Sequence, residues 1–113
     1  MSKSLVLVVA IALFDDRGRV LLAQRPEGKS MAGLWEFPGG KIEPGETPEA
    51  ALVREIAEEL AIQISEKDLN PINFASYTYD SFHLLMPLYA CNKWQGKLRP
   101  KKGKVRNWFD AAP

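Results

Sequence analysis

The stretch FPGGKIEPGETPEAALVREIAEEL, residues 37–60, decides the fold because it holds both a helix signal and the loop that leads into it. Thr47 suits the N-cap of a helix, Pro48 its first position and Glu49 the positive end of its dipole. The pattern predicts a helix that ends near Leu60. The glycines before it predict a loop whose bare backbone can approach the helix closely.

The predicted helix carries an apolar stripe and an acidic stripe. At about 100° per residue, the residues that would dock on a sheet are Leu52, Val53, Ile56 and Leu60. The neighbouring arc, with spacing i, i+3 and i+4, carries Glu55, Glu58 and Glu59. Glu58 and Glu59 lie in the last turn, where the helix dipole disfavours anions by roughly 0.3–1 kcal/mol each.

Two interpretations of the acidic stripe follow from the residues alone. The glutamates could be ordinary solvated surface groups that Arg54 partly offsets. Alternatively, residues 38–40 (PGG) bring backbone carbonyls near the same carboxylates, and hard cations such as Mg²⁺ or Mn²⁺ prefer that set of oxygens. A divalent cation would turn the repulsion into attraction.

The segments on either side of residues 37–60 predict β-strands. LVLVVAIALF, residues 5–14, could pass for a secretion signal, but it favours a buried strand and is shorter than the roughly 20 apolar residues that span a bilayer. The turn DDRGR follows, and VLLAQ, residues 20–24, is predicted to be its hairpin partner. Residues 25–40 predict a long loop, usually functional in a compact domain, around a short strand at 34–37.

Downstream of the helix, PINFASYTYD and SFHLLMPLYACNKW, residues 71–80 and 81–94, predict two strands around a turn. VRNWF, residues 105–109, predicts a final one. Trp94 and Trp108 are expected to be packing residues, and His83, the single histidine, to be structural or solvated.

Composition limits the class of protein. The 113 residues, 46% of them hydrophobic, suffice for one domain with one core. A net charge of +1 gives no global field for nucleic acid or membrane, so neither is an expected partner. The single cysteine, Cys91, cannot form an internal disulfide and is predicted to be buried, which favours a reducing cytoplasm.

The residues from Gly40 to Ile62 resemble the Nudix box of the Nudix hydrolases. Gly40, five residues, Glu46, seven residues, REIAEE and then Ile62 match its fixed positions. LLAQRP at 21–26, residues 33–60, and HLLMPLYAC at 83–91 followed by W-x-G also resemble the MutT-type branch, which hydrolyses oxidised deoxyguanosine triphosphates. The resemblance covers nearly the whole chain.

This resemblance implies an α/β (α+β) fold with a mixed β-sheet sandwiched between helices, as a single domain over residues 1–113. In the MutT-type branch, water attacks a phosphorus of a nucleoside triphosphate and releases the monophosphate and pyrophosphate. The implied role is removal of oxidised purine nucleotides such as 8-oxo-dGTP from the nucleotide pool, which protects DNA replication and repair.

The resemblance also implies site residues. The ligands of Mg²⁺, for which Mn²⁺ could substitute, would be Glu55, Glu58, Glu59 and the carbonyl of Gly40. Arg54 would hold the carboxylates by charge-assisted hydrogen bonds and Glu46 would support them from the loop. The implied catalytic set is therefore Glu58, Glu55, Arg54 and Glu46.

Substrate contacts are implied less directly. Arg25 is either a phosphate partner or a solvated charge, and Phe37 either packs on the base or belongs to the core. Gly39 and Lys41 are further candidates for substrate binding.

The chain departs from the family pattern at three places. Ala61 stands where a glycine with φ > 0 is expected, at a cost on the order of 1 kcal/mol. Lys102 replaces a usual acidic residue, within a basic run (Lys97, Arg99, Lys101, Lys102, Lys104 and Arg106) that is either a solvated loop or meets the triphosphate. The sequence also stops where relatives continue into a C-terminal helix, so we expect that helix to be missing and the protein to be a monomer or a homodimer. These departures leave an alternative open, a catalytically weak Nudix-fold module that binds nucleotides.

Overall fold

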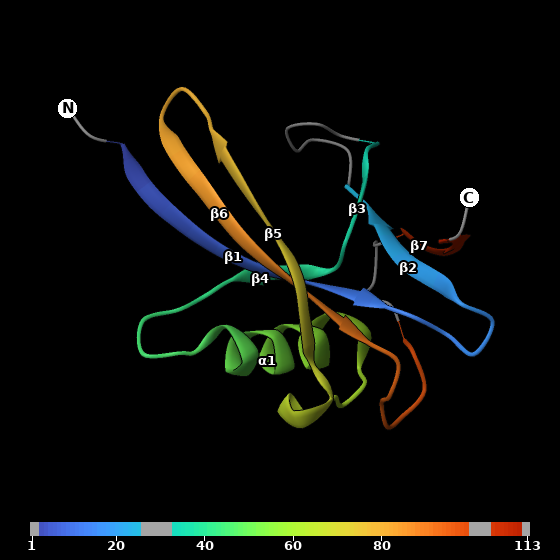
Figure 1. Ribbon diagram of the computed structural model, residues 1–113. Helices are drawn as coiled ribbons and strands as arrows, with labels where there is room; N and C mark the ends of the chain where they lie inside the picture. Colours follow the sequence, from blue (N-terminus) through green and yellow to red (C-terminus); the bar gives the residue numbers. More distant parts are fainter. Residues whose placement is uncertain (1–2, 26–32, 100–104, 112–113) are drawn as a thin grey trace.

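The computed structural model describes residues 3–25, 33–99 and 105–111. This part of the chain forms two β-sheets and one α-helix, which packs on the four-stranded sheet, and the predicted α+β class is confirmed (Figure 1). The sheets have the strand orders β4-β1-β6-β5 and β3-β2-β7. The strands are β1 (Ser4–Leu13), β2 (Arg19–Gln24), β3 (Trp35–Glu36), β4 (Gly39–Lys41), β5 (Asn70–Thr78), β6 (Phe82–Cys91) and β7 (Val105–Asp110). The helix α1 spans Pro48–Leu60, and the 3-10 turn η1 spans Glu66–Asp68.

Strand β1 forms the middle of the larger sheet. Its residues 9–13 are all buried, as expected for an apolar run covered on both faces. β6 runs parallel to it, with Leu88 opposite Ala10, and β4 runs antiparallel, with Gly39 opposite the same Ala10. β5 completes the sheet at the outer side of β6.

The predicted hairpin between residues 5–14 and 20–24 is wrong. Among the described residues, β1 and β2 are joined by a single bridge between Phe14 and Val20. Both edges of β1 are already paired, with β4 and β6, so β2 pairs with β3 and β7 in the second sheet. The two apolar runs therefore belong to different sheets, and a cleft opens between them.

Helix α1 begins and ends where the sequence predicts. The hydroxyl of Thr47 accepts a hydrogen bond from the backbone N–H of Ala50 at 3.1 Å. Of the predicted apolar stripe, Leu52, Ile56 and Leu60 are fully buried and Val53 packs against the same core. The helix covers the four-stranded sheet at β1 and β4. The resemblance implied one mixed sheet between helices, with the C-terminal helix missing, and the described residues form two sheets and one α-helix.

Several single residues have the packing roles that the sequence predicts. Cys91 is buried, and burial raises the pKa of its thiol. Trp94 and Trp108 pack on the core with their ring centroids 6.3 Å apart. His83 shares a hydrogen bond with the hydroxyl of Ser76 at 2.7 Å, which gives it a structural contact on the sheet surface.

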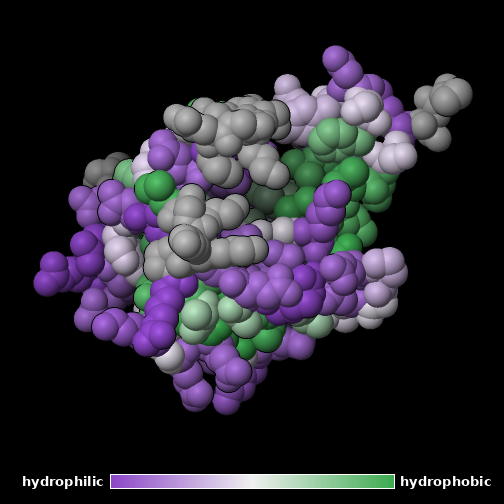
Figure 2. Space-filling model, turned by 180° about the vertical axis from the view of Figure 1, so that it is seen from behind, coloured by the Kyte–Doolittle hydropathy of each residue, from purple (hydrophilic) through white to green (hydrophobic). Residues whose placement is uncertain are grey.

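Apolar side chains stay exposed at the outer end of the four-stranded sheet. Leu5, Phe74 and Tyr77 are more than half exposed, at 58%, 65% and 61%. Figure 2 shows hydrophobic surface gathered near the N-terminal end of the chain. The described residues contain no helix long and apolar enough to cross a membrane.

The left-handed backbone of Ala61 gives a first prediction. Its φ is 59°, a conformation that costs an alanine roughly 1–2 kcal/mol and a glycine almost nothing. We expect Ala61→Gly to raise the free energy of unfolding by about 1 kcal/mol, measured by urea denaturation. Ala57→Gly, at an exposed helical position, is the control and should lower it by roughly 0.5–1 kcal/mol. A loss of stability in Ala61→Gly would contradict this account.

Candidate active site

The site begins where strand β4 touches helix α1. A Cβ added at Gly40 would collide with the carboxylate of Glu55, and a Cβ added at Gly39 would collide with the backbone carbonyl of Val9 on β1. Only glycine leaves room at position 39, where the obstacle is backbone, whereas a side chain at position 40 would have to displace the carboxylate of Glu55. The two glycines therefore let β4 pair closely with β1, and they let the backbone of β4 lie next to the carboxylate of Glu55 on the helix.

Arg54 joins the loop, β4 and the helix through its guanidinium. Its Nε and Nη2 donate to the two carboxylate oxygens of Glu46, at 2.7 and 2.9 Å. Nη1 donates to Glu55 at 2.9 Å, and Nη2 also reaches the carbonyl of Lys41 at 3.2 Å. Such paired, charge-assisted contacts are strong and directional. They fix Glu55 beside Gly40.

The other two glutamates of the acidic stripe are arranged differently. Glu58 is mostly exposed, and its carboxylate lies 3.6 Å from Nη1 of Arg54. Glu59 is 20% exposed and its carboxylate lies 3.6 Å from Nη2 of Arg106 on β7. In this conformation, no group of three acidic, histidine or cysteine side chains in the described residues lies close enough together to hold a metal ion.

The donor set nevertheless has the chemistry of a hard-cation site. Glu55 is held against a strand backbone that has no side chain in the way, and Glu58 and Glu59 follow on the same side of the helix. Carboxylate and carbonyl oxygens are the ligands that Mg²⁺ and Mn²⁺ prefer.

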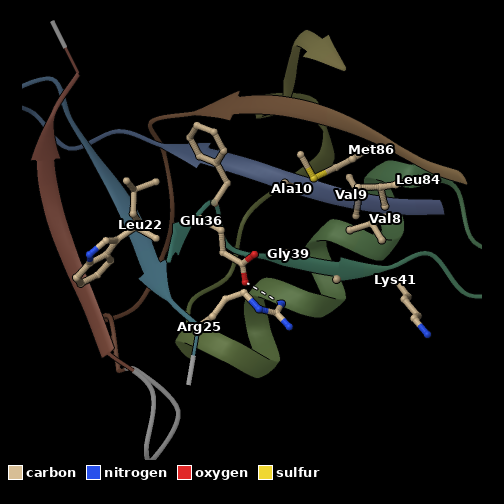
Figure 3. Close-up of a pocket in the computed structure, with 13 residues that line it drawn as sticks. Val8, Val9, Ala10, Leu22, Arg25, Glu36, Gly39, Lys41, Leu84 and Met86 are labelled. Carbon is tan, nitrogen blue, oxygen red and sulfur yellow. Dashed lines mark hydrogen bonds and ion pairs between the residues drawn. The ribbon is translucent and has the colours of Figure 1, made fainter. Parts of the chain in front are cut away.

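A cleft of about 600 Å³ lies on the other side of β4, between the two sheets (Figure 3). Its walls come from β1, β2, β3, β4 and β6, and its lining residues are Val8, Val9, Ala10, Leu22, Arg25, Trp35, Glu36, Phe37, Gly39, Gly40, Lys41, Leu84 and Met86. All four predicted substrate-binding residues, Arg25, Phe37, Gly39 and Lys41, are among them. Gly40 lines the cleft and also contacts Glu55, so it connects the cleft to the acidic stripe.

Two charged residues of the site were missed as site residues by sequence reasoning. Glu36 lines the cleft and pairs with Arg25 at 3.4 Å, as Figure 3 shows. Its signal was a carboxylate inside the short apolar strand LWEF. Arg106, which the sequence placed in a basic run, has a side chain that is only 4% exposed. Lys102, the unusual lysine of that run, lies outside the described residues.

Glu49, which the sequence placed at the positive end of the helix dipole, also makes a contact with the sheet that the sequence did not indicate. The hydroxyl of Tyr89 on β6 donates a hydrogen bond to its carboxylate at 2.9 Å. Burial, helped by this carboxylate, raises the pKa of Tyr89 to about 12. Glu49 therefore supports the packing of α1 on the sheet and stands apart from the acidic stripe.

Together, the fold and the site define an α+β protein with a nucleotide-sized cleft beside carboxylates that suit a divalent cation. The family model of the NUDIX domain matches residues 4–112, and the chain belongs to this family. It is a Nudix hydrolase, a class of enzymes that act on nucleotides and generally use a divalent metal ion.

Relatives and solved structures agree with this assignment. An 8-oxo-dGTP diphosphatase from Proteus vulgaris is 36% identical over 106 residues, which cover 94% of this chain and 93% of that protein. A CTP pyrophosphohydrolase from Escherichia coli is 54% identical over 55 residues, which cover 49% of this chain and 41% of that protein. The solution structure of the E. coli ORF135 protein has a TM-score of 0.81 and 32% identity, covering 96% of this chain and 75% of its own.

The pair between Arg54 and Glu46 predicts a pH effect on stability. Hydrogen bonds from Arg54, and then from the backbone N–H of Glu43, lower the pKa of Glu46 from 4.5 to about 2. A lowered pKa means that the ionised form stabilises the fold, fully above pH 4.5 and less as the pH falls toward 2. We expect Glu46→Gln to lower the melting temperature at pH 6, and this difference from wild type to shrink as the pH is lowered.

Glu66→Gln, on the exposed η1 turn, controls for the change in net charge. If the difference in melting temperature between wild type and Glu46→Gln stayed constant over the same pH range, ionised Glu46 would not be the source of the stabilisation.

Proposed function

We propose that this protein is a Mg²⁺-dependent pyrophosphohydrolase that cleaves nucleoside triphosphates to the monophosphate and pyrophosphate. The observation that carries the proposal is the position of Gly40, which lines the cleft on one side and contacts Glu55 on the other. A nucleotide in the cleft would thereby have its phosphates directed over β4 toward the acidic stripe.

The lining of the cleft combines apolar and charged side chains. Val8, Leu84 and Met86 supply an apolar wall on which a base can pack, together with the half-buried Phe37. Arg25 and Lys41 supply positive charge for the phosphates. Phe37 therefore belongs to substrate binding in this proposal, in preference to a core role.

The residues that would hold the cation are Glu55, Glu58 and Glu59 with the carbonyl of Gly40. When bound, Mg²⁺, or Mn²⁺ in its place, neutralises phosphate oxygens and lowers the pKa of a bound water. Arg54 and Glu46 keep Glu55 in place, and their role is positioning.

We further propose that the substrate is an oxidised purine nucleotide, such as 8-oxo-dGTP, and that the protein sanitises the nucleotide pool of the cytoplasm. The relative from Proteus vulgaris, which aligns over most of both chains, is an 8-oxo-dGTP diphosphatase. The CTP pyrophosphohydrolase aligns over about half of this chain, with 54% identity over 55 residues. A substrate panel must therefore include both purine and pyrimidine nucleotides.

A second candidate function is binding of nucleotides with little hydrolysis. Its supporting observation is that Arg54 and Arg106 pair with the acidic side chains, while no three of these in the described residues form a ready ligand set. This arrangement would lower the occupancy of the cation site at limiting Mg²⁺.

Pyrophosphate release from 8-oxo-dGTP, dGTP, CTP and dCTP at saturating Mg²⁺ separates the two candidates. We expect wild type to turn over 8-oxo-dGTP fastest and Glu58→Gln to reduce the rate by roughly 100-fold or more. Glu66→Gln is the matched control, because it makes the same change at an exposed glutamate outside the acidic stripe. Equal, slow rates for wild type and Glu58→Gln on every substrate would leave only the binding module.

A thermal measurement tests the cation site without activity. A cation that binds the folded chain stabilises it, by about 1.4 kcal/mol at ten times its Kd. We expect millimolar Mg²⁺ to raise the melting temperature of wild type and to raise that of Glu58→Gln less. No shift in wild type would count against the proposed cation ligands.

A further inference from the structure

Arg106 is a buried arginine that the proposed reaction does not use. It lies on β7 opposite Ala23 of β2, and its side chain is only 4% exposed. Nη1 donates to the carbonyl of Val105 at 3.3 Å, whereas Nε and Nη2 are buried without a hydrogen-bond partner in the described structure. Arginine remains charged when it is buried, so this position requires a nearby anion.

The anion that the geometry supplies is Glu59. Its carboxylate lies 3.6 Å from Nη2 of Arg106, which is within ion-pair range but longer than a hydrogen bond. Burial lowers the pKa of Arg106, and the charge of Glu59 opposes that effect. The pair therefore joins β7 to the last turn of α1, at one of the three carboxylates proposed to hold a cation.

Arg54 and Arg106 differ in what they do to the acidic stripe. Arg54 is anchored by two hydrogen bonds to Glu46, outside the proposed ligand set, and it orients Glu55 from the side. Arg106 has no comparable anchor in the described residues, and Glu59 is a proposed ligand itself. If Glu59 turned toward a divalent cation, Arg106 would lose its counter-ion and would stand beside a like charge.

We propose that Arg106 is a built-in cation that competes with the divalent metal ion for Glu59. Occupation of Glu59 by the metal and its pairing with Arg106 oppose each other, so each weakens the other by the same factor. The chain consequently binds its metal mainly through the Glu55 and Glu58 side of the stripe and less tightly than the three glutamates would allow. This inference rests on the proposed cation site.

The test measures Mn²⁺ binding to the whole chain by the electron paramagnetic resonance signal of free Mn²⁺, without substrate. We expect Arg106→Met, which keeps the apolar stem and removes the charge, to bind Mn²⁺ at least about fivefold more tightly than wild type. Arg106→Lys should stay close to wild type. Arg17→Met, in the exposed β1–β2 turn, makes the same change in net charge and should leave Mn²⁺ binding unchanged.

A second comparison asks whether Glu59 carries the effect. If Arg106 acts through Glu59, the gain from Arg106→Met should be largely lost when Glu59→Gln is already present. An equal gain in both backgrounds would mean that Arg106 acts only through its distant charge, and would overturn the proposal. Arg106→Leu is a second neutral variant, and melting without Mn²⁺ identifies which of the two is folded.

The remaining outcomes are also decisive. Unchanged or weaker Mn²⁺ binding in folded Arg106→Met would overturn this inference and leave the proposed function intact. If the same variant lost affinity for inorganic pyrophosphate alone, Arg106 would belong to the phosphate chain and the competition would be refuted. Absence of Mn²⁺ binding in wild type and in every variant would refute the cation site itself, and this inference with it.

Discussion

The site depends on the hydrogen bonds that the guanidinium of Arg54 makes, because they hold together three segments that the backbone alone would not keep in contact. The guanidinium reaches the carboxylate of Glu46 in the loop, the carbonyl of Lys41 on β4 and the carboxylate of Glu55 on α1. A loop before a helix would otherwise leave these groups free to separate in water. Rigid pairing of this kind prepares a site before its ligand arrives, which reduces the ordering that binding must impose.

The separation of β1 from β2 creates the second half of the site. Because β1 has neighbours on both edges, β2 is directed into another sheet, and the space between the sheets becomes a cleft. Gly39 and Gly40 form the boundary between this cleft and the helix, where any side chain would collide with Val9 or Glu55. In the proposed function, the base and the phosphates would thus bind on opposite sides of one short strand.

The acidic stripe is balanced by cations on two sides. Arg54 lies at its beginning and pairs with Glu55, whereas Arg106 on β7 pairs with Glu59 at its end, and both glutamates are proposed metal ligands. Fixed positive charges stabilise the crowded carboxylates when no metal is present, and they also oppose the metal. Stability of the free protein and affinity for the cation are therefore set against each other in the same few side chains. The balance between these two effects bears on whether the protein is a fast enzyme or a nucleotide-binding module, because the two candidates differ in how well the cation site is occupied.

Local signals were enough to predict helix α1, its cap at Thr47 and the paired strands β5 and β6, because neighbouring residues decide caps, periodicity and turns. The left-handed backbone at Ala61 was expected from the resemblance to the family, whose pattern has a glycine there. Spacing at i, i+3 and i+4 was likewise enough to place Glu55, Glu58 and Glu59 on one side of the helix. The partner of β2 was not predictable, since pairing depends on which strand edges remain available. The ion pair of Glu59 with Arg106 joins residues 47 positions apart, and only the packing of β7 beside α1 could bring them together. The sequence by itself thus determined the family and the acidic stripe, while the tertiary structure decided which cation each glutamate meets, because those contacts are made between segments that are distant along the chain.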